Sequence, residues 1–153
     1  MDNEALKQQI TSWESAAEFS EEESQFLEAI ITPPQLMALA EKLRTDASMD
    51  FDYMFCLTCV DFPEHLMMVY HLRSMTHKHE MVLKVRIDNK ENPVVDTLCH
   101  IWRTAEYHER EVYDLFGVKF NNHPDLRRIL LDEDWKGYPL RKDYVDPVNM
   151  ISY

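Results

Sequence analysis

The stretch "HLMMVYHLRSMTHKHEMVLKVRID", residues 65–88, decides the fold of this chain. Both halves are rich in apolar residues typical of strands, and "THK" (76–78) lies between them as a hairpin-like turn. Because successive strand residues point to opposite faces, alternating apolar residues predict one buried face. In the second half they are Met81, Leu83, Val85 and Ile87. We therefore predict paired strands over 65–75 and 79–88.

Elements on either side extend this pattern. "TPPQLMALAEKLRT" (32–45) predicts a helix that Thr32 caps, with prolines in the first turn, where their missing N–H groups cost nothing. "FDYMFCLTCVDF" (51–62) predicts a buried strand, and helical periodicity returns over 97–116 before Gly117. This order predicts an α+β fold with two layers. We expect a mostly antiparallel mixed sheet, helices packed on one face, and an irregular C-terminal extension.

The predicted helix over 97–116 contains one conflict. Glu109 falls on the same face as the apolar stripe, which consists of Leu98, Ile101, Trp102, Ala105, Val112, Leu115 and Phe116. The interpretation that we favour is a break in the helix near Ala105. In the alternative, the carboxylate points inward and needs an Arg or Lys partner, because an unpaired buried charge is costly. The preceding "NKENPVV" (89–95) is predicted to be a loop.

Charge is unevenly distributed along the 153 residues. The net charge is −12, and residues 1–28 hold eight acidic residues and one basic residue. Beyond a short helix, such a segment predicts a solvated arm, or alternatively a docking arm for a basic partner. We therefore divide the chain into an acidic N-terminal arm (1–30), an α+β core domain (31–120) and a charge-rich C-terminal docking extension (121–153).

Composition excludes several function classes. With only two glycines, the chain cannot build a P-loop or a dinucleotide-binding turn, which need clustered glycines at the phosphates. It has no basic stripe for nucleic acid. No apolar run approaches the roughly 18 residues that span a bilayer, and no targeting pattern begins the chain. We expect a cytoplasmic protein that reaches a membrane only through partners.

The chemically reactive side chains do not predict a catalytic, cofactor-binding or metal site. Cys56 and Cys59 lie three apart in a predicted strand, so that their sulfur atoms point to opposite faces, and the third cysteine is distant. Asp114, His123 and Asp125 could supply a carboxylate–imidazole pair for acid–base catalysis. No serine or cysteine nucleophile lies nearby in the sequence, and a turn is the simpler interpretation of the histidine before proline.

The stretch "HPDLRRILLDEDWKGYPLRKDY" (123–144) is dense in charge but too rich in Pro and Gly for one helix. Exposed ion pairs contribute about 0–1 kcal/mol each, whereas ordering a residue costs about 1–2 kcal/mol. Apolar burial is therefore required, and its candidates are Leu126, Ile129, Leu130, Leu131, Trp135, Tyr138, Leu140 and Tyr144. Either the segment folds entirely on its own core, or a partner protein completes the burial while arginine forks fix the register.

Three motifs in order give a family resemblance. They are E-R-E-x-x-D-L-F-G at 109–117, H-P-D-L-R-R-I-L at 123–130 and P-L-R-K-D-Y at 139–144. Over residues 32–147 the chain resembles the 30-kDa subunit family of respiratory complex I, also called the C subunit of NADH-quinone oxidoreductase. Asn122 stands where that family has Gly, and Asn tolerates a positive φ better than most residues.

The resemblance implies a non-catalytic scaffold subunit. Members of the family lie in the hydrophilic arm of a proton-translocating NADH-quinone oxidoreductase and support electron transfer from NADH to quinone. They hold no cofactor of their own, and FMN and iron–sulfur clusters are expected in partner subunits. The expected partners are the large quinone-pocket subunit and neighbouring iron–sulfur subunits, on the cytoplasmic side of the membrane. The alternative is the equivalent subunit of a related membrane-bound hydrogenase, or of a ferredoxin- or F420H2-dependent dehydrogenase complex.

The motifs also suggest which side chains contact a partner. We expect the interface to draw on charged and aromatic residues of the predicted last helix and of the extension. These are Glu109, Arg110, Glu111, Asp114, His123, Asp125, Arg127, Arg128, Trp135, Tyr138, Arg141, Lys142 and Asp143.

Overall fold

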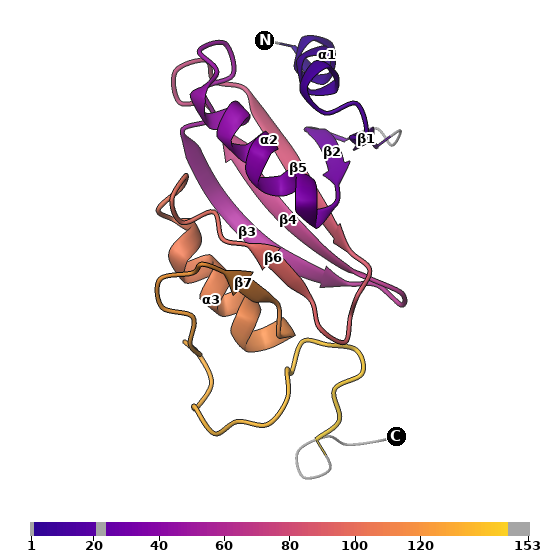
Figure 1. The fold of residues 1–153 in the computed structure, drawn as a ribbon, viewed down its shortest axis with the longest axis vertical. Helices are drawn as coiled ribbons and strands as arrows, with labels where there is room; N and C mark the ends of the chain where they lie inside the picture. The colour runs from indigo at the N-terminus through magenta and orange to yellow at the C-terminus, as the bar shows by residue number, and fades with distance from the viewer. Residues whose placement is uncertain (1, 21–23, 147–153) are drawn as a thin grey trace.

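The computed structural model describes residues 2–20 and 24–146, and it shows a two-layer α+β fold (Figure 1). Within these residues no helix is long and apolar enough to cross a bilayer. The elements in chain order are α1 (Asn3–Trp13), β1 (Glu18–Phe19), β2 (Leu27–Ile31), α2 (Pro33–Thr45), β3 (Tyr53–Asp61), β4 (Leu66–Arg73), β5 (Glu80–Ile87), β6 (Val94–Asp96), α3 (Ala105–Phe116) and β7 (Lys119–Asn121).

The predicted hairpin forms the centre of a five-stranded sheet with the order β1-β2-β5-β4-β3. β4 pairs antiparallel with β5, from Leu66 opposite Ile87 to Arg73 opposite Glu80. β3 adds antiparallel to β4, and β2 adds parallel to β5. The mostly antiparallel mixed sheet expected from the sequence is therefore confirmed.

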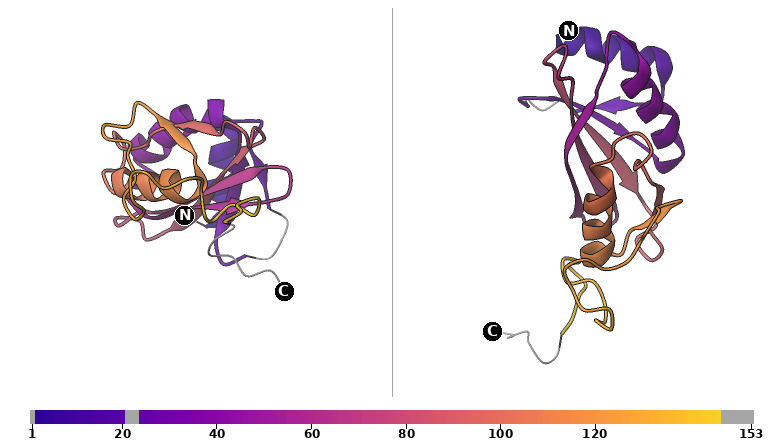
Figure 2. Two further views of the ribbon diagram at one scale, coloured as in Figure 1. Left: turned by 90° about the horizontal axis from the view of Figure 1, so that it is seen from below. Right: turned by 90° about the vertical axis from the view of Figure 1, so that its left-hand side faces the viewer.

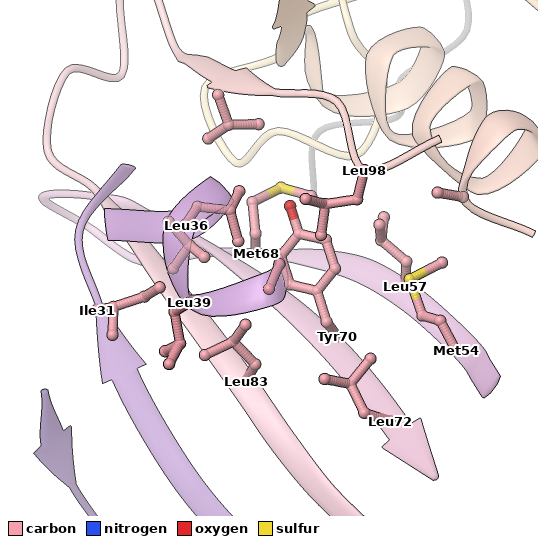
Figure 3. Packing of buried hydrophobic residues seen from close by; sticks show 14 of the residues in the cluster. Ile31, Leu36, Leu39, Met54, Leu57, Met68, Tyr70, Leu72, Leu83 and Leu98 are labelled. Atoms are coloured by element: carbon pink, nitrogen blue, oxygen red, sulfur yellow. The ribbon is translucent and has the colours of Figure 1, made fainter. Parts of the chain in front are cut away.

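The core lies between one face of this sheet and the helices (Figure 3). Tyr70 is fully buried in the middle of β4, and its ring lies near Leu98, while α2 covers the neighbouring strand β5. The α2 residues that face the sheet are Leu36, Leu39, Ala40 and Leu43, as the sequence predicts. The predicted N-cap also holds, because the backbone N–H of Thr32 donates to the Gln35 side chain at 2.7 Å.

The expectation of a solvated arm over residues 1–28 is wrong for the residues that the structure describes. Leu6 and Ile10 of α1 are fully buried, and β2 is an internal strand of the sheet with Ala29 and Ile31 in the core. Among the described acidic residues, Asp2, Glu4 and Glu18 are exposed and alternate with these apolar residues, and total charge is insensitive to such spacing. Whether residues 1–30, 31–120 and 121–153 act as separate functional units stays a prediction.

The region after β5 differs from its prediction at two short strands, β6 and β7. The favoured break near Ala105 is confirmed, because turns occupy 98–104 and α3 begins at Ala105. Gly117 ends that helix with φ +77°, as predicted. The loop predicted over 89–95 is wrong at its end, where β6 begins at Val94 and pairs parallel with β7. Its partner strand lies about 25 residues further along the chain, beyond the reach of local pattern.

The N-terminal helix should contribute directly to stability. Leu6→Ala removes a fully buried side chain, so we expect the free energy of unfolding to fall by about 2–5 kcal/mol in a denaturant titration. Gln8→Ala, at an exposed position of the same helix, is the control and should change it by less than about 0.5 kcal/mol. Equal, small effects would show that α1 does not pack on the sheet.

Candidate protein interface

The C-terminal segment, residues 122–146, runs irregularly past the end of α3 and toward the tips of the long strands (Figure 1). It follows β7 through Asn122, whose φ of +61° confirms the left-handed turn expected at this position. A chain without regular secondary structure must find partners for its backbone N–H and C=O groups elsewhere. Two buried carboxylates supply the principal partners.

The first anchor is Asp114, whose side chain is fully buried on α3. Its Oδ2 accepts three backbone N–H groups, from Ile129 at 3.1 Å, Leu130 at 2.7 Å and Leu131 at 3.0 Å. Its Oδ1 lies 2.8 Å from Nη1 of Arg128. One carboxylate therefore satisfies three consecutive turn amides and a guanidinium at once.

The electrostatic balance at Asp114 favours its charged form. Burial by itself would raise the pKa of this carboxyl, but Arg128 and the three N–H donors outweigh burial and lower the pKa below its ordinary value. The anchor is therefore an ionised, hydrogen-bonded pair. Removing either partner would leave an uncompensated buried charge.

Arg128 extends this anchor into the following turn. Its Nη2 donates to the carbonyl oxygens of Trp135 at 3.1 Å and Gly137 at 3.0 Å, and its guanidinium lies 5.2 Å from the centre of the Tyr138 ring. That ring packs against Gly117, where an added Cβ would lie 2.5 Å from a ring carbon. Glycine is thus required here both for its positive φ and for the space it leaves.

Arg110 also acts inside the chain. Its side chain projects from α3 and donates to the carbonyl oxygens of Arg127 at 3.1 Å and Arg128 at 3.0 Å. Since it is buried and occupied by these carbonyl groups, it fixes the segment from the other side of the turn.

The second anchor is Asp61 at the end of β3. Its Oδ2 accepts the backbone N–H of Lys142 at 2.9 Å, and its Oδ1 lies 2.5 Å from Nζ of Lys90. Burial opposes ionisation, but Lys90 and the Lys142 N–H lower the pKa of this carboxyl. Arg141 donates to the carbonyl oxygen of Lys90, and its guanidinium lies 5.9 Å from the centre of the Tyr138 ring. Arg141 therefore holds the segment to the core.

Glu109 points inward, although the helix also breaks near Ala105, so both proposed outcomes occur together. Within the described part of the chain its hydrogen-bond partners lie in the preceding loop, Nε2 of His123 lies 3.8 Å from its Oε2, and the expected Arg or Lys is not among its partners. Its Oε1 accepts the Leu98 N–H at 2.7 Å, and its Oε2 accepts the Thr97 hydroxyl at 2.5 Å. Burial, the largest influence, raises the pKa of Glu109.

His123, Glu109 and Cys99 approach one another, with one ligand-type atom from each within 4.8 Å of the others. His123 nevertheless uses both ring nitrogens. Nε2 lies 3.0 Å from the carbonyl oxygen of Glu106, so it must donate, and Nδ1 accepts the Asp125 N–H at 3.0 Å. Burial raises the pKa of Cys99 to about 12, which favours the protonated thiol. The Cys99 thiol lies 3.4 Å from Oε2 of Glu109, to which it donates, and both His123 ring nitrogens are engaged with backbone groups.

This geometry divides the residues that the sequence predicted for the interface. Side chains that are buried or occupied within the chain are Glu109, Arg110, Asp114, His123, Arg128, Tyr138 and Arg141. Exposed side chains are Glu111, Asp125, Arg127, Lys142 and Asp143, and Trp135 is half-buried. The first set supports the segment through contacts inside the chain, and the side chains of the second set are the more accessible to solvent.

A small apolar hollow lies beside the first anchor. It has a volume of about 140 Å³ and is lined by Tyr107, His108, Glu111, Ile129 and Leu130. Leu130 is 64% exposed even though its backbone N–H is fixed to Asp114. Arg127 follows the same pattern, with its backbone held by Arg110 and its side chain 61% exposed beside Asp125. We call these lining residues together with Arg127 the docking hollow.

Asp114→Asn tests the first anchor. Loss of the buried charge pair should lower the free energy of unfolding by about 3–5 kcal/mol and speed amide exchange at residues 129–131. Because the pKa of Asp114 is lowered, its contribution is present above the ordinary value of 3.8 and is lost as pH falls through the folded-state pKa. Asp125→Asn, at an exposed pair, is the control. Unchanged exchange in Asp114→Asn would contradict the anchor.

Glu109→Gln tests the buried carboxyl through pH. A raised folded-state pKa means that stability is greatest below the ordinary value of 4.5 and declines as pH rises through the folded-state pKa. Denaturant titrations across this range should show the decline in the natural chain and a weaker decline in Glu109→Gln. Glu111→Gln, which alters an exposed carboxyl on the same helix, should show the same decline in stability as the natural chain. Identical profiles for all three chains would refute a raised pKa at Glu109.

Comparison with solved structures supports the same fold. The membrane-bound sulfane sulfur reductase, an archaeal respiratory membrane complex, contains a chain that aligns with a TM-score of 0.75 and 29% sequence identity. The alignment covers 95% of this chain and 86% of that one, so it includes most of the C-terminal segment as well as the sheet.

The chain is also similar in sequence to C subunits of NADH-quinone oxidoreductase from several bacteria. The C subunit of NADH-quinone oxidoreductase from Chloroherpeton thalassium is 49% identical over 109 residues, which are 70% of this chain and 45% of the relative. The corresponding protein of Chlorobium phaeobacteroides is 44% identical over 128 residues, or 82% of this chain and 76% of the relative. The C/D subunit from Phocaeicola vulgatus is 45% identical over 111 residues, which are only 21% of that relative. The chain thus spans less than half the length of some relatives.

The family profile matches most of the chain. Residues 29–148 match the family described as respiratory-chain NADH dehydrogenase, 30 Kd subunit. This range begins within β2 and includes both anchors and the docking hollow. The chain therefore belongs to the respiratory-chain NADH dehydrogenase 30 Kd subunit family.

Proposed function

We propose that this chain is a non-catalytic scaffold subunit in the hydrophilic arm of a proton-translocating NADH-quinone oxidoreductase, where it supports electron transfer from NADH to quinone. The observation that carries the proposal is the docking hollow. Buried anchors fix the backbone of 127–131, while Leu130 and Arg127 stay exposed. A preorganised surface of this kind lowers the conformational entropy lost when a partner binds.

The non-catalytic part of the proposal rests on how the chemically capable groups are used. Asp114 accepts N–H groups from the C-terminal segment, and Glu109 accepts hydrogen bonds from the loop before α3. His123 has backbone groups on both ring nitrogens. Each of these groups contributes to structure, and FMN and iron–sulfur clusters are expected in the partner subunits.

The proposed partners are the large quinone-pocket subunit and neighbouring iron–sulfur subunits, on the cytoplasmic side of the membrane. The relative named as a C/D subunit supports the first partner, since its match to this chain is confined to a fifth of its length. A fusion of two subunits favours their close packing. Peripheral attachment through such partners agrees with the lack of a membrane-spanning helix among the described residues.

The docking hollow has the features of a compact binding site. Tyr107 and Leu130 provide apolar area that a partner side chain can cover, and such central apolar contacts dominate binding free energy at interfaces. The Arg127 guanidinium provides a fork for a partner carboxylate, which fixes orientation. Asp125 holds that guanidinium in place before binding, with its Oδ2 at 2.9 Å from Nε.

A second candidate is the equivalent subunit of a related complex. The likeness to a chain of the archaeal sulfane sulfur reductase complex, at 29% identity and over nearly the whole chain, favours this candidate. This second candidate also includes the equivalent subunits of membrane-bound hydrogenases and of ferredoxin- or F420H2-dependent dehydrogenases. The two candidates share the scaffold role and differ in the subunits that deliver electrons.

Affinity purification of the tagged chain from gently solubilised membranes tests the proposal. We expect stoichiometric recovery of a quinone-pocket subunit and iron–sulfur subunits. Leu130→Asp and Arg127→Ala should each reduce that recovery by about tenfold or more, because each removes a contact at the centre of the interface. Both positions are exposed, so the melting temperature of the isolated chain should stay nearly unchanged.

The matched control is Met75→Asp, which alters an exposed apolar residue in the β4–β5 turn, far along the chain from the docking hollow. It should leave recovery intact. Full recovery of the complex by Leu130→Asp would contradict the docking hollow, and purification of a lone chain would contradict the scaffold role. An NADH-binding flavoprotein among the recovered chains selects the first candidate, and its replacement by another electron-input subunit selects the second.

A further inference from the structure

His123 lies where the C-terminal segment leaves β7. Figure 2 shows that most of this segment lies beyond the end of α3, so the turn at its start sets the direction in which it leaves the core. That turn follows Asn122, whose φ of +61° is left-handed, and Pro124 comes directly after His123. The side chain of His123 is fully buried, so a titratable ring lies at the base of the segment.

The two ring nitrogens of His123 hold this turn in one protonation state of the ring. Nε2 donates to the carbonyl oxygen of Glu106 at 3.0 Å, and Nδ1 accepts the backbone N–H of Asp125 at 3.0 Å. Nδ1 can accept only while it carries no proton, because both nitrogens of an imidazolium are donors. The contact to the Asp125 N–H therefore requires the neutral ring.

Asp125 connects this turn to the docking hollow. Its carboxylate accepts from Nε of Arg127 with both oxygens, at 3.1 and 2.9 Å. The released N–H and the carboxylate belong to the same residue, so loss of the first contact leaves the carboxylate free to move. A protonated ring also competes for that carboxylate, because a charged N–H is a strong donor to it.

The groups around His123 carry more negative than positive charge. Burial disfavours an imidazolium, and nearby carboxylates favour it. The titratable and charged groups on the surrounding elements are Glu106 and Glu109 of α3, Cys99 of the preceding loop, Asp125 and Arg127 of the segment, and Asp96 of β6, which binds Asn121 beside the turn. The pKa of the Cys99 thiol is raised to about 12, so Cys99 adds no charge. The carboxylates thus outnumber the guanidinium.

Glu109 makes the strongest case for proton uptake by the ring. Its Oε2 lies 3.8 Å from Nε2 of His123, and both side chains are fully buried. Burial raises the pKa of Glu109, and positive charge on His123 opposes that rise. Each group therefore affects the protonation of the other.

We propose that the turn at residues 123–127 is a pH-sensitive switch of the docking hollow. When Nδ1 of His123 takes up a proton from solvent, the ring releases the Asp125 N–H and draws the Asp125 carboxylate away from Arg127. Arg127 then loses the contact that orients it, so a partner meets a less ordered surface at low pH. The inference rests on the proposed function, since it describes the regulation of the same docking hollow.

Solution NMR of the isolated chain, with its nitrogens isotope-labelled, tests the switch. At about pH 8 the His123 ring should show the signals of an Nε2–H tautomer, and titration to about pH 5 should convert it to an imidazolium. The backbone amide signal of Asp125 should shift with the same midpoint. The protection of that amide from exchange should fall by about tenfold, the factor expected for loss of one hydrogen bond.

Three variants give matched comparisons. His123→Asn supplies a side-chain oxygen that can accept the N–H two residues further on and does not titrate, so the Asp125 amide signal should stay constant. Glu109→Gln removes the carboxylate 3.8 Å from the ring, so the midpoint of His123 should move to lower pH. His100→Asn, which replaces an exposed histidine in the loop before α3, should leave the titration of His123 unchanged.

Recovery of the complex at two pH values tests the link to the docking hollow. The tagged natural chain should recover fewer partner subunits at about pH 5.5 than at about pH 7.5. Groups of the partners titrate equally in both experiments, so the comparison with His123→Asn isolates the switch. In that variant the ratio of the two recoveries should rise by about threefold to tenfold, the range for ordering one long side chain at an interface.

The outcomes separate this inference from the proposed function. If the natural chain recovers no other subunit at either pH, the proposed function fails, and the NMR titration still decides whether the turn switches. A ring that stays neutral down to about pH 5, or an Asp125 amide that does not follow it, overturns the switch and leaves the scaffold role standing. Equal pH dependence of recovery in the natural chain and in His123→Asn overturns the regulation of the docking hollow.

Discussion

The buried Asp114 carboxylate makes the interactions on which the order of the C-terminal segment depends. It accepts three consecutive backbone N–H groups from 129–131 and pairs with Arg128, which in turn binds two carbonyl oxygens of the next turn. An irregular segment lacks the regular backbone hydrogen bonds of a helix or a sheet, so its N–H and C=O groups need other partners. Here charge-assisted hydrogen bonds to side chains of α3 supply those partners, and Asp61 of β3 makes a similar contact further along the segment.

These anchors explain how a segment can be ordered without burying all of its apolar side chains. The backbone is fixed by polar contacts to the core, so side chains such as Leu130 are held at the surface in a defined geometry. The two alternatives raised by the sequence thus coexist, since the segment folds on its own core and still presents apolar surface. The same division holds in the sheet, where one face forms the core and the other presents Val60 and Phe62.

Much of the fold was accessible from local pattern. The alternation in 79–88, the capped helix at 32–45 and the glycine that ends α3 are each encoded within about a dozen residues, and each is confirmed. The N-terminal segment was misjudged because its eight acidic residues obscured the spacing of Leu6 and Ile10. β6 was missed because its partner strand is remote in sequence. The interface residues named from charge included several that the structure uses internally, since charge alone does not tell an anchor from a contact.

By itself, the sequence determined the fold class, the central hairpin and the family motifs. Periodicity and motif order are properties of short segments and need no knowledge of distant contacts. Only the tertiary structure decided what the charged residues of those motifs do. Asp114 and Arg128 are two charges fourteen residues apart in the sequence, but they become a buried anchor because α3 carries one of them beneath the turn that holds the other. Burial, not residue type, separates the charges that hold this chain together from those exposed at its surface.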